Sequence, residues 1–232
     1  MSGEVIRTKN FVADASKFIL EQATESLKAR GQFRIALSGG NTPRPVNSEF
    51  ARIGKDLPWQ RMIFTFGDER CVPPDDAQSN YRMARESLFE PAGVPAESIL
   101  RMRGEIDPET AAREYENQLK LLARERQEEL YQHDLILLGI GDDGHTASLF
   151  PGTAALGEKS QAVKANFVPK FNTWRLTMTY PIINHSRAVC FLVNAAKNSE
   201  LIERVIAGNQ QYPAARVNAT SGKLFWILGE TA

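Results

Sequence analysis

Cysteine and histidine are scarce in this sequence, with two and three residues respectively among 232. Cys71 and Cys190 cannot build a disulfide framework, which favours a reducing, cytoplasmic setting. A zinc site needs about four ligands at characteristic spacings, and the scattered His133, His145 and His185 do not supply them. The sequence therefore predicts no bound metal.

An excess of charge and a long apolar run are also missing. Lysine plus arginine equals aspartate plus glutamate at 28 each, so no overall field attracts nucleic acid or an anionic membrane. No apolar segment approaches the roughly 20 residues that cross a bilayer. The first residues, MSGEVIRTKNF, lack the order of a secretion signal. We therefore expect a cytoplasmic protein that binds neither nucleic acid nor a membrane, and any anion site must be local.

What the sequence does contain is a regular alternation of two patterns. Apolar residues at helical spacing predict helices over 12–30, from about 43, and over 79–89, 108–131 and about 197–207. Short apolar runs predict strands at 33–37, 61–66, 134–140, 174–180, 188–194 and 223–228. Such alternation is typical of a Rossmann-like, doubly wound α/β fold, in which helices flank a mostly parallel sheet. We expect a single domain over 1–232. If the chain were divided into two domains, the boundary would be expected within 91–108.

The loop SGGNTP follows the first predicted strand. Gly39 and Gly40 allow backbone N–H groups to approach a ligand closely, and Ser38, Asn41 and Thr42 add donors beside the start of a helix. This composition suits a phosphate, although a plain glycine turn has the same sequence. The loop does not match the P-loop pattern, so it does not indicate a nucleotide.

Polar loops also follow the second and third predicted strands. Asp68 and Arg70 lie where an arginine can clamp an anion or stabilise developing negative charge, and a solvated charge cluster is the alternative. Asp143 and His145 lie in GIGDDGH, and a carboxylate beside a histidine is the pairing that general-base catalysis needs. A structural histidine with capping aspartates is the alternative there. Because the carboxyl ends of parallel strands meet at one edge, the three loops favour a common site.

Two basic residues could complete an anion site. Arg175 enters the fourth predicted strand and Lys197 opens the last predicted helix, so each could close on a phosphate or be only a surface charge. Cys71 has no histidine near it in the sequence to activate it, so we do not expect a thiol nucleophile. His133 and His185 have no comparable setting and are expected to be structural or exposed.

Five blocks resemble, in order and spacing, the motifs of 6-phosphogluconolactonases in the glucosamine-6-phosphate isomerase/6-phosphogluconolactonase family: LSGGNTP, DERCVPPDDAQSNYR, LLGIGDDGHTASLFPGT, RLTMTYPIIN and FLVNAAKN. The match covers about residues 10–228. The resemblance implies a glucosamine-6-phosphate deaminase-like fold and hydrolysis of 6-phospho-D-glucono-1,5-lactone to 6-phospho-D-gluconate. This reaction is the second step of the oxidative pentose phosphate pathway, and the resemblance implies no required metal or redox cofactor.

The related glucosamine-6-phosphate deaminases, which are aldose–ketose isomerases, are the serious alternative. In the deaminases a glutamate that supports ring opening stands where this chain has Phe150, and a tyrosine stands where it has Arg70. Both differences favour the lactonase. Asn41 replaces a serine that is common in the lactonases, yet it can still donate to phosphate. A non-catalytic sugar-phosphate sensor is a second alternative, although phosphate capture alone would not need Asp143 and His145 together with Arg70.

The residues and the resemblance together predict a division of roles. His145 is expected to act as the general base toward water, with Asp143 supporting it and Arg70 stabilising the oxyanion. Asp68 is expected to position Arg70 or a substrate hydroxyl. The expected partner is a phosphosugar lactone, and seven residues are predicted to bind its phosphate: Ser38, Gly39, Gly40, Asn41, Thr42, Arg175 and Lys197. A monomer is favoured.

Overall fold

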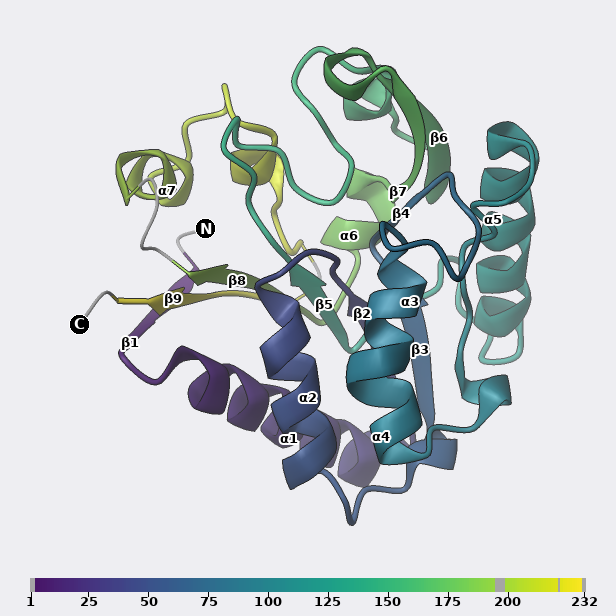
Figure 1. The fold of residues 1–232 in the computed structure, drawn as a ribbon, viewed down its shortest axis with the longest axis vertical. Coiled ribbons are helices and arrows are strands. Elements are labelled where there is room, and N and C mark those ends of the chain that lie inside the picture. Colours follow the sequence, from purple (N-terminus) through teal and green to yellow (C-terminus); the bar gives the residue numbers. More distant parts are fainter. Residues whose placement is uncertain (1–2, 195–198, 221, 231–232) are drawn as a thin grey trace.

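A computed structural model describes residues 3–194, 199–220 and 222–230, and a six-stranded sheet lies at its centre (Figure 1). All neighbouring strands of this sheet run parallel. In spatial order the strands are β1 (Glu4–Thr8), β9 (Lys223–Gly229), β8 (Ala188–Asn194), β5 (Leu135–Leu138), β2 (Phe33–Leu37) and β3 (Met62–Phe66). The predicted fold class is confirmed.

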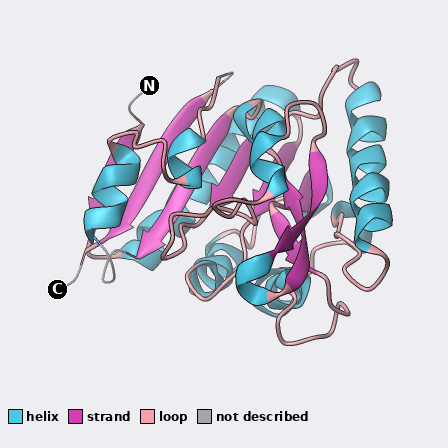
Figure 2. Ribbon diagram, turned by 90° about the horizontal axis from the view of Figure 1, so that it is seen from above, coloured by secondary structure: helices cyan, strands magenta, loops and turns pink. Residues whose placement is uncertain are grey.

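Helices cover both faces of the main sheet, as Figure 2 shows from above. One face carries α1 (Phe11–Arg30), α2 (Pro43–Ile53) and a helical segment made of α3 (Asn80–Ala84), the π-helical η2 (Arg85–Phe89) and α4 (Glu90–Ala92). The other face carries α5 (Pro108–Arg124), α6 (Tyr180–Asn184) and α7 (Ser199–Ile206). Short 3₁₀ turns connect these elements: η1 (Trp59–Arg61), η3 (Ala96–Ser98), η4 (Ala154–Gly157), η5 (Pro169–Phe171) and η6 (Pro213–Arg216).

The central strands are buried on both faces and so divide their side chains between two apolar cores. Leu135 and Leu137 of β5 pack into the core under α1 and α2. Ile136 and Leu138 pack into the core of the opposite face. This alternation explains why LILL reads as a continuous apolar run, because a strand of a covered parallel sheet has no solvent-facing side.

A second, three-stranded antiparallel sheet has the order β4 (Asp68–Arg70), β7 (Thr173–Met178) and β6 (Val163–Val168). Helix α5 packs against it, since Ala112 and Tyr115 share a core with Val163 and Leu176. Two expectations need correction here. The strand expected at 174–180 belongs to this small sheet, and Asp68–Arg70, expected as loop, forms a short strand that pairs with it.

Two strands and one helix end differ from the sequence expectations, and one helix start cannot be compared. Strands β1 and β6 were not predicted, because both lie at sheet edges and neither is a continuous apolar run. Helix α5 ends at Arg124 rather than at 131, and the following turn contains Gln127 with a positive φ of 58°. Helix α7 is described from Ser199, so the beginning expected near Lys197 lies outside the described residues.

The strand order places a crevice at the carboxyl ends of β2 and β5. From β2 the chain moves outward to β3, and it returns to the other side of β2 when it enters β5. Ligands of doubly wound sheets bind where the direction of winding changes in this way. The loops 38–42 and 139–145 leave β2 and β5 at this point, so the fold itself brings the two glycine-containing loops together.

Candidate active site

A cavity of about 450 Å³ opens at this crevice. Nine of the predicted site residues line it: Ser38, Gly39, Gly40, Asn41, Thr42, Asp68, Arg70, His145 and Arg175. They come from the ends of β2 and β5 and from the small antiparallel sheet. Asp143 lies behind His145 rather than on the cavity wall, and Lys197 lies outside the described residues.

His145 is held from three directions. Its Nδ1 lies 2.5 Å from Oδ1 of Asp143. Its ring stacks on Phe150, with centroids 3.9 Å apart and planes inclined by 24°. Gly141 closes the third side, because a Cβ at that position would lie 1.9 Å from Cε1 of the imidazole. Only glycine allows the backbone to pass so close to the ring, so the loop sequence itself fixes where the histidine stands.

Asp143 is ionised beside this histidine. Partial burial opposes ionisation, but hydrogen bonds from Lys170 and His145 outweigh it and lower the pKa of the Asp143 carboxyl to about 2. An ionised carboxylate can only accept, so Nδ1 of His145 carries the proton and donates it. The other ring nitrogen, Nε2, is then the one left to accept a proton from a ligand or water in the cavity.

Asp68 joins three segments of the cavity wall. Its Oδ2 accepts a 2.6 Å hydrogen bond from Oγ of Ser148, and its Oδ1 accepts from Nδ2 of Asn80 at 3.2 Å. Asn80 in turn lies against Gly39, where a Cβ would stand 1.9 Å from its Oδ1. Both oxygens of the buried Asp68 are thus engaged by the protein, which gives this residue a structural part in shaping the cavity.

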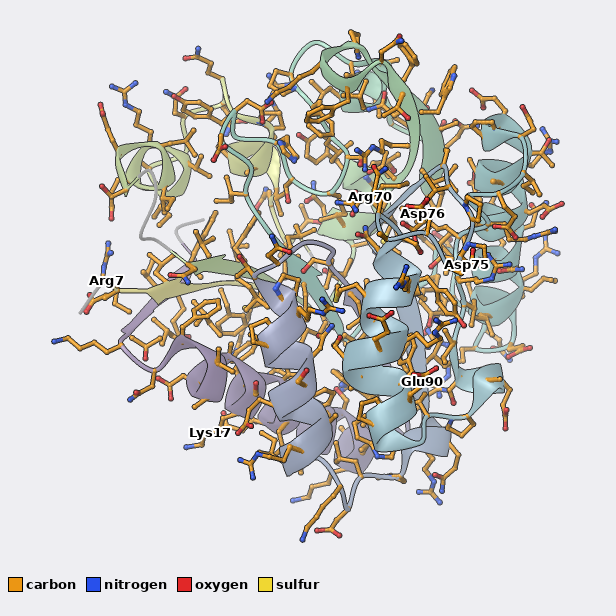
Figure 3. All side chains as sticks on the ribbon, viewed as in Figure 1. Arg7, Lys17, Arg70, Asp75, Asp76 and Glu90 are labelled. Carbon is orange, nitrogen blue, oxygen red and sulfur yellow. The ribbon has the colours of Figure 1, made fainter. Side chains whose placement is uncertain are left out.

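Arg70 of β4 and Arg175 of β7 are directly paired on neighbouring strands of the small sheet. Burial and the charge of Arg70 lower the pKa of the Arg175 guanidinium. Each Nε atom is buried without a hydrogen-bond partner, and within residues 3–194, 199–220 and 222–230 neither guanidinium forms an ion pair. Figure 3 shows Arg70 near β4 over the middle of the molecule, whereas Arg7 and Lys17 extend from its edge. Two neighbouring guanidinium groups, each with a buried Nε that lacks a partner among the described residues, favour an anion at this end of the cavity.

The glycine loop supplies a second source of positive potential. Gly40 has a φ of 97°, a backbone conformation that glycine adopts readily. The loop leads into α2, whose N-terminal residues Thr42 and Pro43 line the cavity and whose first turn holds no acidic residue. Free backbone N–H groups and the helix dipole favour an anion at such a terminus.

The residues set aside at the sequence level occupy structural positions. Burial raises the pKa of the Cys71 thiol to about 11, so it stays protonated and is a poor nucleophile. His133 is fully buried, with Nε2 2.9 Å from Oγ1 of Thr65, and His185 is half-buried. Buried Glu69 accepts N–H bonds from Asn80 and Tyr81 and so anchors the segment that follows β4.

Several residues of the site were not singled out from the sequence. Thr146 lines the cavity and its buried Oγ1 has no partner, and Ser148 binds Asp68. Their position beside His145 in GHTAS was the available signal. Lys170 and Phe171 come from the turn between β6 and β7, and nothing in PKFN distinguishes them from surface residues. Only the fold brings that turn to the site.

Among the described residues, no group of three or more histidine, cysteine, aspartate or glutamate side chains is arranged to hold a metal ion. In the same part of the chain, no helix combines the length and the apolar surface that a bilayer crossing needs.

Comparison with known proteins agrees with the resemblance read from the sequence. A family model described as glucosamine-6-phosphate isomerases/6-phosphogluconolactonase matches residues 7–226. A 6-phosphogluconolactonase of Synechocystis sp. is 40% identical over 92% of this chain and 89% of its own length. The chloroplastic 6-phosphogluconolactonase 3 of Arabidopsis thaliana is 31% identical over 97% of this chain and 71% of its own length.

A solved structure gives the same result at the level of the fold. The crystal structure of 6-phosphogluconolactonase from Thermotoga maritima superposes with a TM-score of 0.85 and 26% sequence identity, and covers 97% of this chain and 99% of that one. Since the family model and these relatives match most of its length, the chain belongs to the glucosamine-6-phosphate isomerase/6-phosphogluconolactonase family.

Proposed function

We propose that this chain hydrolyses 6-phospho-D-glucono-1,5-lactone to 6-phospho-D-gluconate, the second step of the oxidative pentose phosphate pathway. The curated relatives named above are 6-phosphogluconolactonases. The observation that carries the proposal is that a histidine–carboxylate pair and two neighbouring guanidinium groups, whose buried Nε atoms lack partners among the described residues, meet at one cavity. The pair suits the activation of water, and the cations suit a phosphorylated substrate.

The hydrolysis follows from the tautomer of His145. Because Nδ1 donates to Asp143, Nε2 takes a proton from water as the water oxygen bonds to the lactone carbonyl carbon. The tetrahedral intermediate then collapses, the bond between that carbon and the ring oxygen breaks, and the ring oxygen receives the proton from His145. Asp143 stabilises the imidazolium in between, and the acid product loses a proton to solvent.

The two arginines are assigned to opposite ends of the substrate. We assign Arg70 to the oxyanion that develops on the carbonyl, and Arg175 to the phosphate together with the loop Ser38–Thr42. Lys197 stays a predicted phosphate ligand. Phosphate binding far from the reacting carbon anchors the ring, so that water meets the carbonyl in a productive geometry. Asp68 has its two oxygens bound by Ser148 and Asn80, which supports a positioning role.

The deaminase alternative finds no support at the position that distinguishes the two activities. Phe150 stands where the deaminases carry their ring-opening glutamate, and its ring is buried and stacked on His145. No carboxylate can therefore reach the substrate from this position.

The direct experiment offers freshly prepared 6-phosphogluconolactone to the purified protein and follows acid production, after subtraction of spontaneous opening. Acceleration supports the proposal. Binding of the lactone without acceleration supports a sugar-phosphate sensor instead, and release of ammonia from glucosamine 6-phosphate supports a deaminase.

We also propose that the chain works as a monomer in the cytoplasm. The predicted site residues that line the cavity meet within a single copy of the chain, which is what a monomeric enzyme requires. The compartment differs within the family, since the Arabidopsis relative is chloroplastic. Size-exclusion chromatography with light scattering, compared with activity across protein concentrations, tests the monomer.

A further inference from the structure

Lys170 binds the oxygen of Asp143 that His145 does not use. It lies in η5, the turn between β6 and β7, and its Nζ is 2.8 Å from Oδ2 of Asp143. Oδ1 of the same carboxylate is 2.5 Å from Nδ1 of His145. The carboxylate is therefore held at both oxygens, by a cation at Oδ2 and by the imidazole and the backbone N–H of His145 at Oδ1.

The same turn reaches the imidazole by a second route. Phe171 packs edge-on against Phe150, with ring centroids 5.6 Å apart and planes inclined by 83°. Phe150 in turn stacks on His145. One short turn thus contacts the carboxylate through Lys170 and the aromatic support of the imidazole through Phe171.

An ordinary surface ion pair does not explain this arrangement. The Lys170 side chain is 52% exposed, and an exposed pair by itself adds little stability because water competes for both charges. Asp143 is less exposed, at 27%, and a carboxylate bound at only one oxygen can rotate about its bond to Cβ. A second bond at the other oxygen removes that freedom, and the orientation of the carboxylate sets the orientation of the imidazole.

We propose that Lys170 is a positioning residue for the lactonase reaction, which holds the carboxylate of Asp143 so that His145 keeps its productive orientation. This inference rests on the proposed function, in which His145 activates water. Lys170 does not touch the substrate; it acts only through Asp143. Its removal is therefore expected to slow the chemical step more than it weakens substrate binding.

The test is Lys170→Met, which keeps the length of the side chain and removes its charge. We expect kcat to fall about tenfold, as when a contact that orients a catalytic group is lost, with KM changed less than about twofold. Lys170→Arg retains a cation that can reach the carboxylate and should restore most of kcat. Lys164→Met is the matched control, since Lys164 lies on the same hairpin and pairs with Glu158 at 2.9 Å, away from Asp143. It should keep wild-type kinetics.

A double-mutant cycle separates positioning from a general structural effect. If Lys170 acts through Asp143, adding Lys170→Met to Asp143→Asn should lower kcat no further than Asp143→Asn alone. Wild-type kcat in Lys170→Met, or independent effects of the two substitutions, would overturn the inference. Lys170→Gln provides a second variant for the same comparison if Lys170→Met does not fold.

The control variants show which proposal has failed. If Asp143→Asn and His145→Ala both lose activity while Lys170→Met does not, only the positioning role is wrong. If neither Asp143→Asn nor His145→Ala loses activity, the proposed mechanism and the role of Lys170 fall together.

Discussion

Arg70 and Arg175 are cross-strand partners in the pairing of β4 with β7, and in the described part of the chain neither forms an ion pair. Burial and, after it, the charge of Arg70 lower the pKa of the Arg175 guanidinium, so the two neighbouring cations repel each other. In the proposed assignment, the phosphate beside Arg175 and the oxyanion that develops beside Arg70 would both offset that repulsion. The repulsion is therefore smaller when substrate binds, which ties the geometry of the small sheet to recognition of a phosphate.

Arg175→Ala should weaken binding of the phosphorylated lactone more than it slows the reaction. Loss of a charge-assisted hydrogen bond of about 1.5–3 kcal/mol raises KM roughly 10- to 100-fold. The unphosphorylated gluconolactone, tested under the same conditions, should show no such increase. Arg52→Ala is the control, because Arg52 is exposed and its ion pair in the described part of the chain is with Glu49. An unchanged KM in Arg175→Ala would remove Arg175 from the phosphate site.

Lys197→Ala tests the one predicted phosphate ligand that lies outside the described residues. If Lys197 contacts the phosphate, KM for the phosphorylated lactone should rise in the same direction as in Arg175→Ala, because each contributes a charge-assisted contact. Steady-state kinetics on both lactones provide the measurement. Equal KM values for the variant and the wild type would reject the assignment.

Gly39→Ala should damage both the fold and the activity. A Cβ at Gly39 would lie 1.9 Å from Oδ1 of Asn80, whose Nδ2 binds the backbone oxygen of Asp68 at 2.9 Å. Asn80 must move and disturb Asp68, so we expect a loss of about 1–3 kcal/mol in stability and at least a tenfold fall in kcat/KM. Gly157→Ala is the control, since a Cβ there meets nothing within 4 Å. Denaturant unfolding and kinetics of both variants make the comparison.

His133 should make the stability depend on pH. Burial, with the nearby charge of Arg34, lowers the pKa of this fully buried histidine to about 3, from its ordinary 6.5. The unfolded chain takes up a proton as the pH falls below 6.5, but the folded protein does not until about pH 3. The stability contributed by neutral His133 is therefore fully present above pH 6.5 and is lost as the pH falls toward 3, by about 1.4 kcal/mol per pH unit.

The variant His133→Gln removes that titration. Urea unfolding at several values between pH 4.5 and 7.5 should show a shallower pH dependence for the variant than for the wild type. His185→Gln, which changes a half-buried histidine, serves as the comparison variant. Parallel curves for the wild type and His133→Gln would mean that His133 takes up its proton over the same pH range in the folded and the unfolded protein, and would contradict the prediction.

The part of the fold that the sequence predicts best is the part with strong local periodicity. LILL and the first six residues of AVCFLVN are apolar because β5 and β8 are covered on both faces, so the sequence alone predicts these two strands. EVIRT and VKANFV mix exposed and buried positions, since β1 and β6 lie at sheet edges. A local pattern also does not reveal which sheet a strand joins, so β7 was expected in the wrong one.

The site residues divide in the same way, into those with a local sequence signal and those without one. His145, Asp143 and the glycine loop directly follow buried strands, and the rule that ligands bind at the carboxyl edge predicts their meeting. Asn80 and Lys170 act through contacts with residues distant in sequence, Asp68 and Asp143, and these depend on how the small sheet packs. Neither residue type is unusual for a turn or a helix start, so only the structure reveals these two.

The most direct test of the central claim, that His145 activates water in this cavity, is the background-corrected rate of 6-phosphogluconolactone hydrolysis by His145→Ala. Circular dichroism and denaturant unfolding establish that the variant is folded. Loss of the general base predicts a fall in kcat of about 10²- to 10⁴-fold, with KM nearly unchanged because the phosphate contacts remain. A folded His145→Ala variant that turns over the lactone at the wild-type rate would contradict the claim.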